Sequence, residues 1–451
     1  MKVRGEKVTV VGLGETALAA VRLLCREGAR PYVTELADGE RFAPFCAELD
    51  ALGVSWECGG HSEKAFEGAR YVIPSPGVSP QIAPIATARE TGATVLGEME
   101  FAWPFCRSKI LAVTGTNGKT TTTELLRSMI ETCGHTVLLA GNNALPFSAA
   151  VMIDPAPEYI VLEVSSYQLE TARRFRPHIA AVLNVTPDHL ARHDSLWHYA
   201  NVKARIFRAQ QVGDTAVVNG DDVWTREMDL PIGVRRAAFS IEGPCDEGLW
   251  LDGDAIREGR AAVAHVADTQ LVGRHNLQNV LAALTMMRAG GFGWDKTLAG
   301  LRAFRGVEHR IEPVAEIDGV RFYNDSKSTN VDSLRVALES FAEPVVLIAG
   351  GRGKGAGYEG LRALVEQHVK RLVTLGEDAP ALERDLGDLV ATERASDMND
   401  AVRRAVAAAA PGDVVLLSPA CASFDRYANF EERGRDFKTC VHALERKGNV
   451  A

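Results

Sequence analysis

The stretch that most limits what this chain can fold into is ILAVTGTNGKTTTTELL, residues 110–126. It opens with an apolar run that is typical of a buried strand, and glycines follow at positions 115 and 118. Apolar side chains at positions 125, 126, 129 and 130 then share one face of a helix. A strand, a glycine loop and a helix in this order predict an α/β sheet whose loop binds a phosphate group.

This loop, TGTNGKT, is shorter than the GxxxxGK[ST] phosphate loop, because Val113 stands where that pattern has its first glycine. The shorter loop can bind phosphate for the same physical reasons as the longer one. Backbone N–H groups at the start of a helix point at phosphate oxygens, and the helix dipole adds positive potential. Lys119 supplies a charge and Thr120 a hydroxyl group for Mg²⁺. A plain turn between a strand and a helix is the alternative interpretation of these residues.

Strand-like and helix-like segments alternate along the 451 residues, a length that exceeds what one hydrophobic core usually serves. We therefore expect an α/β protein of three domains, with bounds 1–98, 99–306 and 307–451. The first and third are predicted to be Rossmann-like, and the central one to be a phosphate-loop ATPase-like domain with a mixed sheet. Within it, short strands such as TAVVNG and GLWLDG between Gly and Asp turns favour an antiparallel annex over residues 213–273.

The N-terminal segment VTVVGLGETA carries a GxGxxA pattern, with Gly12, Gly14 and Ala17. About twenty residues later, Glu35 is expected to end a second strand, where a dinucleotide-binding fold holds a ribose hydroxyl group. The same glycines are as typical of a tight turn without a ligand. The pattern indicates a nucleotide-like site and leaves the cofactor undecided.

Polar residues follow two further apolar runs of the predicted central domain. YIVLEVSSYQLE places Glu163 at the end of a strand, and AAVLNVTPDHLARH places His189 in the following loop. Ligands of open α/β sheets bind at the carboxyl edge of the strands, and Mg²⁺ takes one or two carboxylates beside phosphate and water. Glu163 is therefore a candidate metal ligand, whereas a loop histidine is more often a surface residue than a ligand.

Charge and cysteine usage exclude several classes of protein. A formal net charge of −9 argues against a dominant nucleic-acid surface. The sequence has no uninterrupted apolar stretch near the roughly 20 residues that cross a bilayer, and its N-terminus runs directly into a strand. Eight cysteines without a CxxC pair indicate neither a zinc site nor a disulfide framework. We expect a cytoplasmic monomer without nucleic-acid or membrane partners.

Seven motifs carry a resemblance to a known family; in chain order they are TGTNGKTTTT, LEVSSYQLE, LNVTPDHLARH, GRHNLQN, NDSKSTN, GGRGKG and LSPACASFDRYANFEERG. Together they resemble the Mur ligase family over all three domains. The shortened phosphate loop marks the wider family, which includes folylpolyglutamate synthases. NDSKSTN and the last motif resemble the corresponding motifs of the family member that adds D-glutamate. The resemblance implies that ATP phosphorylates the carboxylate of UDP-N-acetylmuramoyl-L-alanine and that the amine of D-glutamate then forms an amide, in cytoplasmic peptidoglycan precursor synthesis.

The resemblance also assigns residues to ATP and to Mg²⁺, for which two sites are expected. The implied ATP-binding residues are Gly115, Thr116, Asn117, Gly118, Lys119, Thr120, Thr121, Asn279, Arg310, Asp325 and Lys327. The implied metal ligands are Thr120, Glu163, His189 and Lys203, the lysine as a carbamate, and the implied catalytic residues are Lys119, Glu163, His189 and Lys203. Carbamylation needs a neutral amine, so Lys203 would have to be desolvated or close to cations. Without the resemblance, a helix lysine is more typical of a solvated surface.

Two further sets of residues follow from the same resemblance. The UDP-sugar would contact Gly14, Thr16, Ser75, Gly77, Asn142 and His189. D-glutamate would contact Thr329, Lys354, Ser423 and Phe430. Two carboxylates need fixed hydrogen-bond donors and a cation, and the set supplies both. The GxGxxA turn would then hold a diphosphate without any hydride chemistry.

Three alternatives stay open at this point. Another amide-forming member of the family would differ in its amino acid and acceptor, although the DNPR-like run of a diaminopimelate-adding enzyme is absent from the sequence. A nucleotide-dependent switch would use the loop as a GTPase does, but the sequence has no NKxD-like guanine motif and the third domain would have no role. A nicotinamide-dependent oxidoreductase would leave the phosphate loop unexplained.

Overall fold

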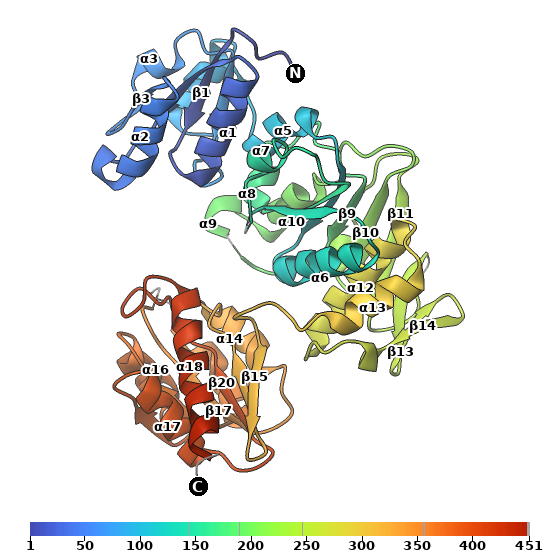
Figure 1. Cartoon of the computed structure of the whole chain (residues 1–451), viewed down its shortest axis with the longest axis vertical. Coiled ribbons are helices and arrows are strands. Elements are labelled where there is room, and N and C mark those ends of the chain that lie inside the picture. Colours follow the sequence, from blue (N-terminus) through green and yellow to red (C-terminus); the bar gives the residue numbers. More distant parts are fainter. Residues whose placement is uncertain (143, 189, 246, 354, 356, 449–451) are drawn as a thin grey trace. The chain divides into compact units, whose positions relative to one another are not determined.

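The computed structural model describes residues 1–448 apart from 143, 189, 246, 354 and 356. It contains three sheets flanked by helices (Figure 1), which confirms the predicted α/β fold of three domains. One compact unit, Met1–Thr269 with Gln278–Phe304, holds the N-terminal and central sheets, and a second, Gln270–Leu277 with Arg305–Ala451, holds the C-terminal sheet. The individual domain boundaries stay a prediction.

The N-terminal sheet has five parallel strands in the order β3-β2-β1-β4-β5. Its strands are β1 (Lys7–Val11), β2 (Arg30–Thr34), β3 (Ser55–Glu57), β4 (Tyr71–Pro74) and β5 (Thr94–Val95), and its helices are α1 (Glu15–Arg26), η1 (Gly39–Phe42), α2 (Ala43–Ala51), α3 (Glu63–Phe66) and α4 (Ala83–Glu90). Val8 and Val10 of β1 belong to the core that includes α1, whereas Val11 packs in a second core with α4. Helices therefore cover both faces, as expected for a parallel sheet.

The central sheet has nine strands in the order β14-β13-β12-β11-β10-β9-β6-β8-β7. Its strands are β6 (Lys109–Thr114), β7 (Val137–Gly141), β8 (Tyr159–Glu163), β9 (Ile179–Val182), β10 (Thr215–Asn219), β11 (Arg235–Ser240), β12 (Gly248–Asp252), β13 (Ala255–Glu258) and β14 (Ala261–His265). The helices from this part of the chain are α5 (Glu98–Ala102), η2 (Trp103–Phe105), α6 (Lys119–Thr132), α7 (Phe147–Ala150), α8 (Ser166–Leu169), α9 (Leu190–His193), α10 (Leu196–Ala204), α11 (Val223–Arg226), η3 (Val266–Asp268), α12 (Arg274–Ala289) and α13 (Trp294–Ala303). The central sheet is mixed, as the sequence predicts.

The antiparallel annex predicted over residues 213–273 is only partly correct. β10 pairs in parallel with β9 and with β11, and β11 pairs in parallel with β12. The antiparallel pairs of this segment are β12 with β13 and β13 with β14. The prediction is therefore wrong for β10 and β11. Every residue of β10 is buried, as expected of a strand covered on both faces, and α11 lies in the connection to β11, so the chain crosses over instead of turning back.

The C-terminal sheet has six strands in the order β15-β16-β20-β17-β18-β19. Its strands are β15 (Glu312–Ile317), β16 (Val320–Asn324), β17 (Val345–Ala349), β18 (Val369–Thr374), β19 (Thr392–Arg394) and β20 (Val414–Leu417), and its helices are α14 (Val331–Leu338), η4 (Glu359–Leu361), α15 (Arg362–His368), α16 (Ala379–Leu386), α17 (Met398–Ala408) and α18 (Phe430–Gly448). The sequence pattern predicts β16, β17, β18 and β20. It does not predict β15, an antiparallel edge strand that contains a proline and has no fully buried residue.

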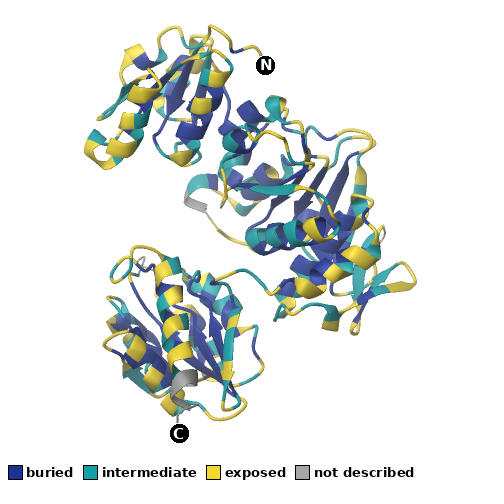
Figure 2. Cartoon of the chain, in the orientation of Figure 1, coloured by how far each residue is buried: buried dark blue, intermediate teal, exposed yellow. Residues whose placement is uncertain are grey.

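Alternate residues of β17 face two separate cores in this sheet. Val345, Leu347 and Ala349 pack with α14, α15 and α16, whereas Val346 and Ile348 pack with α17 and α18. The strands are accordingly dark blue between partly exposed helices in Figure 2. The continuous apolar run VVLIA follows from this burial on both faces.

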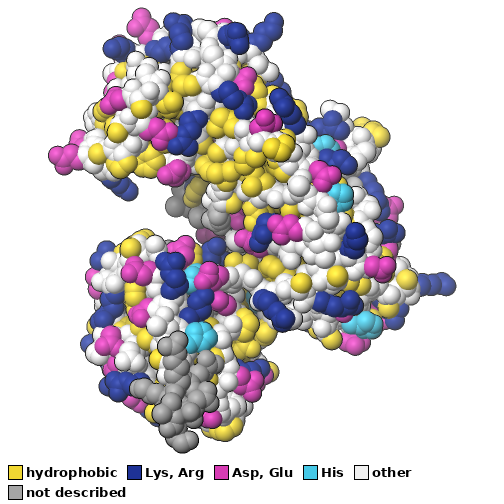
Figure 3. Space-filling model, in the orientation of Figure 1, with side chains coloured by type: hydrophobic (Ala, Val, Ile, Leu, Met, Phe, Trp, Pro, Cys, Tyr) yellow, Lys and Arg dark blue, Asp and Glu magenta, His cyan; other side chains and the backbone are white. Residues whose placement is uncertain are grey.

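Charges of both signs are mixed on the face drawn in Figure 3, where lysine and arginine side chains alternate with aspartate and glutamate. Among the described residues, no helix combines the length and the apolar character that crossing a bilayer requires. All eight cysteines are free thiols.

Candidate active site

The predicted phosphate loop connects β6 to α6, as expected from its sequence. Gly118 is the N-cap of α6 and has a φ of 84°, a left-handed conformation that favours glycine. Because the N-cap residue is a glycine, no N-cap side chain lies over the first turn of the helix. A Cβ atom at Gly118 would lie 2.1 Å from Oδ1 of Asn279 on α12. The fold therefore brings two predicted ATP-binding residues into close contact.

The segment after β9 holds this loop in place. Oδ1 of Asn184 accepts a hydrogen bond from the backbone N of Asn117 at 2.9 Å, and Nδ2 of Asn184 donates to the carbonyl of Asn117 at 3.2 Å. Oγ1 of Thr116 donates to the carbonyl of Thr186 at 3.2 Å and accepts from its N–H at 3.1 Å. Asn184 and Thr186 thus shape the phosphate loop.

Two lysines meet at the carbonyl of Gly115. Nζ of Lys119 donates to this carbonyl at 3.0 Å and to the carbonyl of Thr116 at 2.9 Å. Nζ of Lys203, on α10, donates to the same Gly115 carbonyl at 2.8 Å. Lys203 is only 1% exposed, so the surface interpretation of this helix lysine is wrong.

The surroundings of Lys203 favour a neutral amine. Burial, followed by the charge of Lys119, lowers the pKa of Lys203 well below its usual value of 10.5, and Asp188 opposes this shift. Nζ of Lys203 also lies 4.3 Å from the centre of the ring of Tyr199. Burial raises the pKa of Tyr199 to about 12, so this neighbour stays an uncharged phenol. A neutral amine is the form that carbamylation requires.

Glu163 lies at the carboxyl edge of the central sheet, beside the strand that leads into the phosphate loop. It is the last residue of β8, is 3% exposed, and pairs in register with Val113 of β6. Nδ2 of Asn142 donates to Oε1 of Glu163 at 3.1 Å. The fold thus brings together a predicted metal ligand and a predicted UDP-sugar contact. His189, predicted for both roles, lies outside the described residues.

The N-terminal glycine turn is built around Ser75 and Glu35. A Cβ atom at Gly12 would lie 2.9 Å from Oγ of Ser75, so the turn after β1 and the turn after β4 are in close contact. Oε2 of Glu35 accepts from the backbone N of Leu13 at 2.8 Å, and Oε1 accepts from the backbone N of Ala37 at 3.0 Å. Glu35 therefore stabilises the turn that carries Gly14, the N-cap of α1.

In the second compact unit, Asp325 is buried directly after β16. Its Oδ1 accepts from the backbone N of Ile311 at 3.2 Å and its Oδ2 from Oγ of Ser418 at 2.8 Å. Burial raises the pKa of Asp325 to about 7, although these hydrogen bonds and the charges of Arg310 and Arg433 act in the opposite direction. A carboxyl group with this pKa titrates near neutral pH.

Predicted ATP-binding and D-glutamate-binding residues are neighbours in this unit. Nζ of Lys327 lies 5.8 Å from the centre of the ring of Phe430, the first residue of α18. Ser423 is 2% exposed, and its carbonyl accepts from the backbone N of Tyr427 at 2.9 Å. Thr329 directly precedes Asn330, the N-cap of α14. Lys354 lies outside the described residues.

Arg433 connects the loop after β16, which carries Lys327 and Thr329, to the loop after β20, which carries Ser423, and sequence reasoning missed it. Its Nη2 donates to the carbonyl of Ser326 at 2.8 Å, and its Nη1 donates to the carbonyl of Cys421 at 3.0 Å. Burial lowers the pKa of Arg433 to about 10. Arg433 stands in the run NFEERGR, which is typical of an exposed charged helix. Its place inside a family motif was the signal that could have singled it out.

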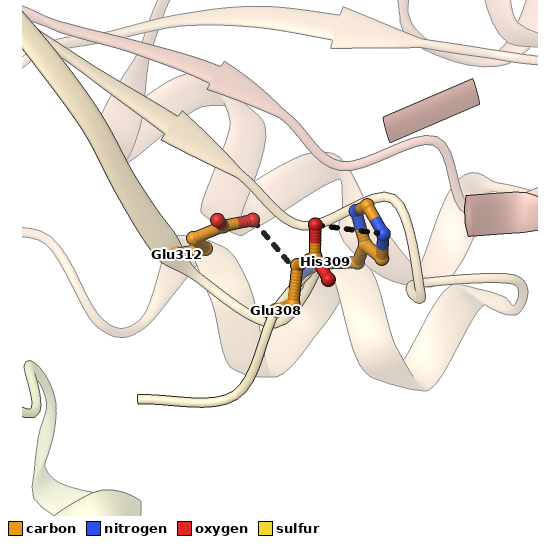
Figure 4. A group of neighbouring side chains, drawn as sticks. All are labelled: Glu308, His309 and Glu312. Atoms are coloured by element: carbon orange, nitrogen blue, oxygen red, sulfur yellow. Dashed lines mark hydrogen bonds and ion pairs between the residues drawn. The ribbon is translucent and has the colours of Figure 1, made fainter. Parts of the chain in front are cut away.

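A group of three titratable side chains near β15 is drawn in Figure 4. His309 Nε2 lies 3.6 Å from Oε1 of Glu308, and the backbone N of His309 donates to Oε2 of Glu312 at 2.9 Å. Nζ of Lys438 lies 2.5 Å from Oε1 of Glu308 and 3.0 Å from Oε1 of Glu312. Because Lys438 compensates both carboxylates, we regard this group as an ion-pair cluster and not as a metal centre.

Family profiles match this chain in three consecutive parts. The Mur ligase MurD-like N-terminal domain matches residues 6–97, the Mur ligase middle domain matches residues 113–287, and the Mur ligase glutamate ligase domain matches residues 309–421. The chain belongs to the Mur ligase family. This family carries out ATP-dependent amide ligation in the synthesis of peptidoglycan precursors.

Curated Mur ligases resemble the chain over its whole length. The UDP-N-acetylmuramoylalanine–D-glutamate ligase of Pelotomaculum thermopropionicum is 42% identical over 98% of both chains. The enzyme of the same name from Anaeromyxobacter dehalogenans is 43% identical over 97% of both chains. Among solved structures, the MurF ligase from Thermotoga maritima in complex with ADP has a TM-score of 0.60 at 17% identity, covering 98% of this chain and 96% of that one. At this identity, the structural likeness concerns the fold alone.

Replacing Gly118 of this Mur ligase by alanine is expected to destabilise it by about 1–2 kcal/mol and to weaken ATP binding at least about tenfold. The added methyl group strains the left-handed backbone and forces Asn279 away from the loop. Gly134→Ala is the matched control, because Gly134 has a similar φ of 91° but no atom within 4 Å of its Cβ position. Calorimetry should find normal ATP affinity for the control. Equal affinities of the two variants would contradict the prediction.

Asp325→Asn is expected to stabilise this Mur ligase more at pH 8 than at pH 5, by about 2–3 kcal/mol. The folded pKa of Asp325 is about 7 and its ordinary value is 3.8, so its stabilising contribution is complete below pH 3.8 and is lost as the pH rises through 7. Asparagine stays neutral over this window. Urea unfolding at both pH values measures the difference, with the exposed Asp332→Asn as control. A pH-independent difference would show that Asp325 is charged in the folded chain.

Proposed function

We propose that this Mur ligase adds D-glutamate to UDP-N-acetylmuramoyl-L-alanine through an acyl phosphate formed from ATP. The observation that carries the proposal is the convergence of Lys119 and the buried Lys203 on the phosphate loop, in a chain at least 40% identical over nearly its full length to enzymes named for this reaction. We place the reaction in the cytoplasm and expect a monomer. Eight free cysteines support a reducing compartment.

The phosphate loop fits the terminal phosphates of ATP. A glycine at the N-cap leaves backbone and no side chain at the start of α6, where the helix dipole favours negative charge. Lys119 would neutralise β- and γ-phosphate charge from within this loop. The hydroxyl of Thr120 and the carboxylate of Glu163 offer oxygen ligands for Mg²⁺, which, when bound, supplies positive charge to the phosphate oxygens. Thr121 and Asn279 complete this side of the nucleotide site.

A second Mg²⁺ would be held by His189 and by a carbamate on Lys203. The carbamate forms when the neutral amine attacks CO₂ and loses a proton, so that an N–C bond forms and a carboxylate oxygen becomes available. The buried position of Lys203 supports the neutral amine that this step needs. The ammonium of Lys119, which donates to the same carbonyl, would favour the anionic product.

The residues of the chain serve the reaction chiefly through electrostatics. The carboxylate of the UDP-sugar peptide attacks the γ-phosphorus, the bond to the β-phosphate oxygen breaks, and ADP leaves. The amine of D-glutamate then attacks the acyl carbon, and phosphate leaves as the amide forms. Both steps concentrate negative charge on oxygen, which Lys119 and the Mg²⁺ held by Thr120 and Glu163 would offset.

Substrate contacts are proposed on both compact units. Gly14, Thr16, Ser75, Gly77 and Asn142 would hold the UDP-sugar, and the close contact of Gly12 with Ser75 supports a compact diphosphate cradle. Thr329, Lys354, Ser423 and Phe430 would hold D-glutamate, and Arg433 links the loop that carries Thr329 to the loop that carries Ser423. Arg310, Asp325 and Lys327 stay the proposed nucleotide contacts of the second unit.

Phosphate release measured with one amino acid at a time tests this function. With ATP, Mg²⁺ and UDP-N-acetylmuramoyl-L-alanine present, release is expected with D-glutamate and not with L-glutamate, glycine, L-lysine or meso-diaminopimelate. Equal or faster release with another amino acid would overturn the substrate assignment. Release that needs no amino acid and no UDP-sugar would favour the nucleotide-dependent switch.

A further inference from the structure

A pocket in the first compact unit is lined by four arginines that the proposed ligase function does not use. It has a volume of about 340 Å³, and its lining includes Arg89, Arg173, Arg205 and Arg208. This size falls within the range of pockets that hold small molecules. Arg89 comes from α4 beside the N-terminal sheet, and the other three come from the segments that follow α8 and α10 of the central domain.

The four guanidinium groups are not neutralised by the protein. Among the residues that the structure describes, none of the four has a carboxylate oxygen within ion-pair distance; instead, Arg89 donates to the carbonyl of Pro80 at 2.9 Å and Arg205 to the carbonyl of Glu170. Glu170 is the one carboxylate in the lining, and its two oxygens already accept hydrogen bonds from Arg192, each at 2.8 Å. The pocket therefore carries an excess of positive charge.

Arg205 is the most enclosed of the four, and its position is electrostatically costly. It is half-buried, and Arg173 and Arg208 line the same pocket. Like charges held together at a site of reduced hydration repel one another. An anion between them would remove this repulsion and would gain charge-assisted hydrogen bonds.

We propose that this pocket binds a small organic phosphate. The planar guanidinium fork matches a phosphate group bidentately, and several arginines suit its double negative charge. Val95 and Ala172 in the lining offer apolar surface to the organic part of the ligand. Because Arg89 and Arg205 approach from different domains of the same unit, the bound phosphate would also link the N-terminal and central domains.

The pocket has a physical connection to α9. Glu170 lies in the lining, and Arg192, which binds it, stands three positions after His189 and also donates to the carbonyl of Val78 at 3.4 Å. His193 Nδ1 lies 3.9 Å from Oε1 of Glu170. A ligand that changes the position of Glu170 would therefore act on both α9 and the turn after β4.

Calorimetric titration of the full chain with glycerol 3-phosphate tests the proposal, in a Lys119→Ala background that removes the charge of the phosphate loop. We expect binding in this background and at least about tenfold weaker binding when Arg205→Gln or Arg208→Gln is added, since each change removes a charge-assisted contact. Arg260→Gln, an exposed arginine outside the pocket, should leave the affinity unchanged. Glycerol, without the phosphate, should not bind.

Three results would overturn the proposal: no binding in the Lys119→Ala chain, equal affinity in the arginine variants, or citrate binding as tightly as glycerol 3-phosphate. Thermal unfolding checks that each variant is folded. If the Arg205→Gln variant does not fold, Arg89→Gln and Arg173→Gln are titrated instead, because both side chains are exposed. Their unchanged affinity would be equally decisive against the site. Because Lys119→Ala already inactivates the proposed ligase, this test is independent of the amino-acid specificity of the reaction.

Discussion

Lys119→Ala is expected to lower kcat for phosphate release by at least about 10³-fold, because the γ-phosphate then loses its main source of positive charge within the loop. The ammonium of Lys119 donates to the carbonyls of Gly115 and Thr116 and so lies inside the turn that would hold the phosphates. The loop itself should survive, since Asn184 and Thr186 bind it independently. The measurement is steady-state phosphate release with all substrates at saturation.

Lys109→Ala is the matched control, because Lys109 lies on the same strand, β6, but is exposed. It removes the same charge without touching the loop, and its kcat should stay within about twofold of the wild-type value, as is usual for a surface change. A Lys119→Ala variant that is folded and retains wild-type kcat would contradict the assignment of the phosphate loop. An equal loss of kcat in both variants would indicate a general effect of the removed charge.

Lys203→Ala is expected to lower kcat by about 10²-fold or more, and a small carboxylic acid such as acetate should restore part of the activity. The substitution removes a buried side chain, and the space that it leaves beside Tyr199 would admit the added acid. Acetate would then supply the carboxylate oxygen that the carbamate supplies in the wild-type chain. Phosphate release against acetate concentration measures the rescue.

Lys203→Met provides the contrast, because methionine is also unbranched and apolar and refills most of the space. This variant should be inactive and should not respond to acetate. Wild-type activity should rise when bicarbonate is returned to a CO₂-depleted sample, and carbon-13 NMR should show a carbamate signal that is absent from both variants. Full wild-type activity without CO₂, together with no such signal, would exclude the carbamate.

Local sequence patterns predicted much of the fold and part of the candidate site. β6, Gly115, Gly118 and α6 are adjacent in sequence, so their spacing is enough to predict a strand, a loop and a helix. The run VVLIA likewise predicts a strand buried on both faces. The antiparallel prediction is wrong for β10 and β11 because Gly and Asp turns occur in crossover connections as well as in hairpins.

Other parts of the site depend on contacts between distant segments, which the spacing of residues does not contain. Arg433 stands in a charged run, yet it is 2% exposed, and its guanidinium group donates to carbonyls of the loops after β16 and β20. The four arginines of the proposed phosphate pocket come from two domains, and no sequence window holds them together. Their shared excess of charge is therefore visible only in the folded chain.

The sequence alone determined the chemistry that is available: a glycine loop with Lys119, a carboxylate at the end of an apolar strand, and the motifs of a Mur ligase. These features are local, because backbone conformation and side-chain alternation depend on near neighbours. Only the tertiary structure decided that Lys203 is buried against the carbonyl of Gly115, 88 residues away in sequence. Burial and charge proximity set its pKa, and both are products of long-range packing.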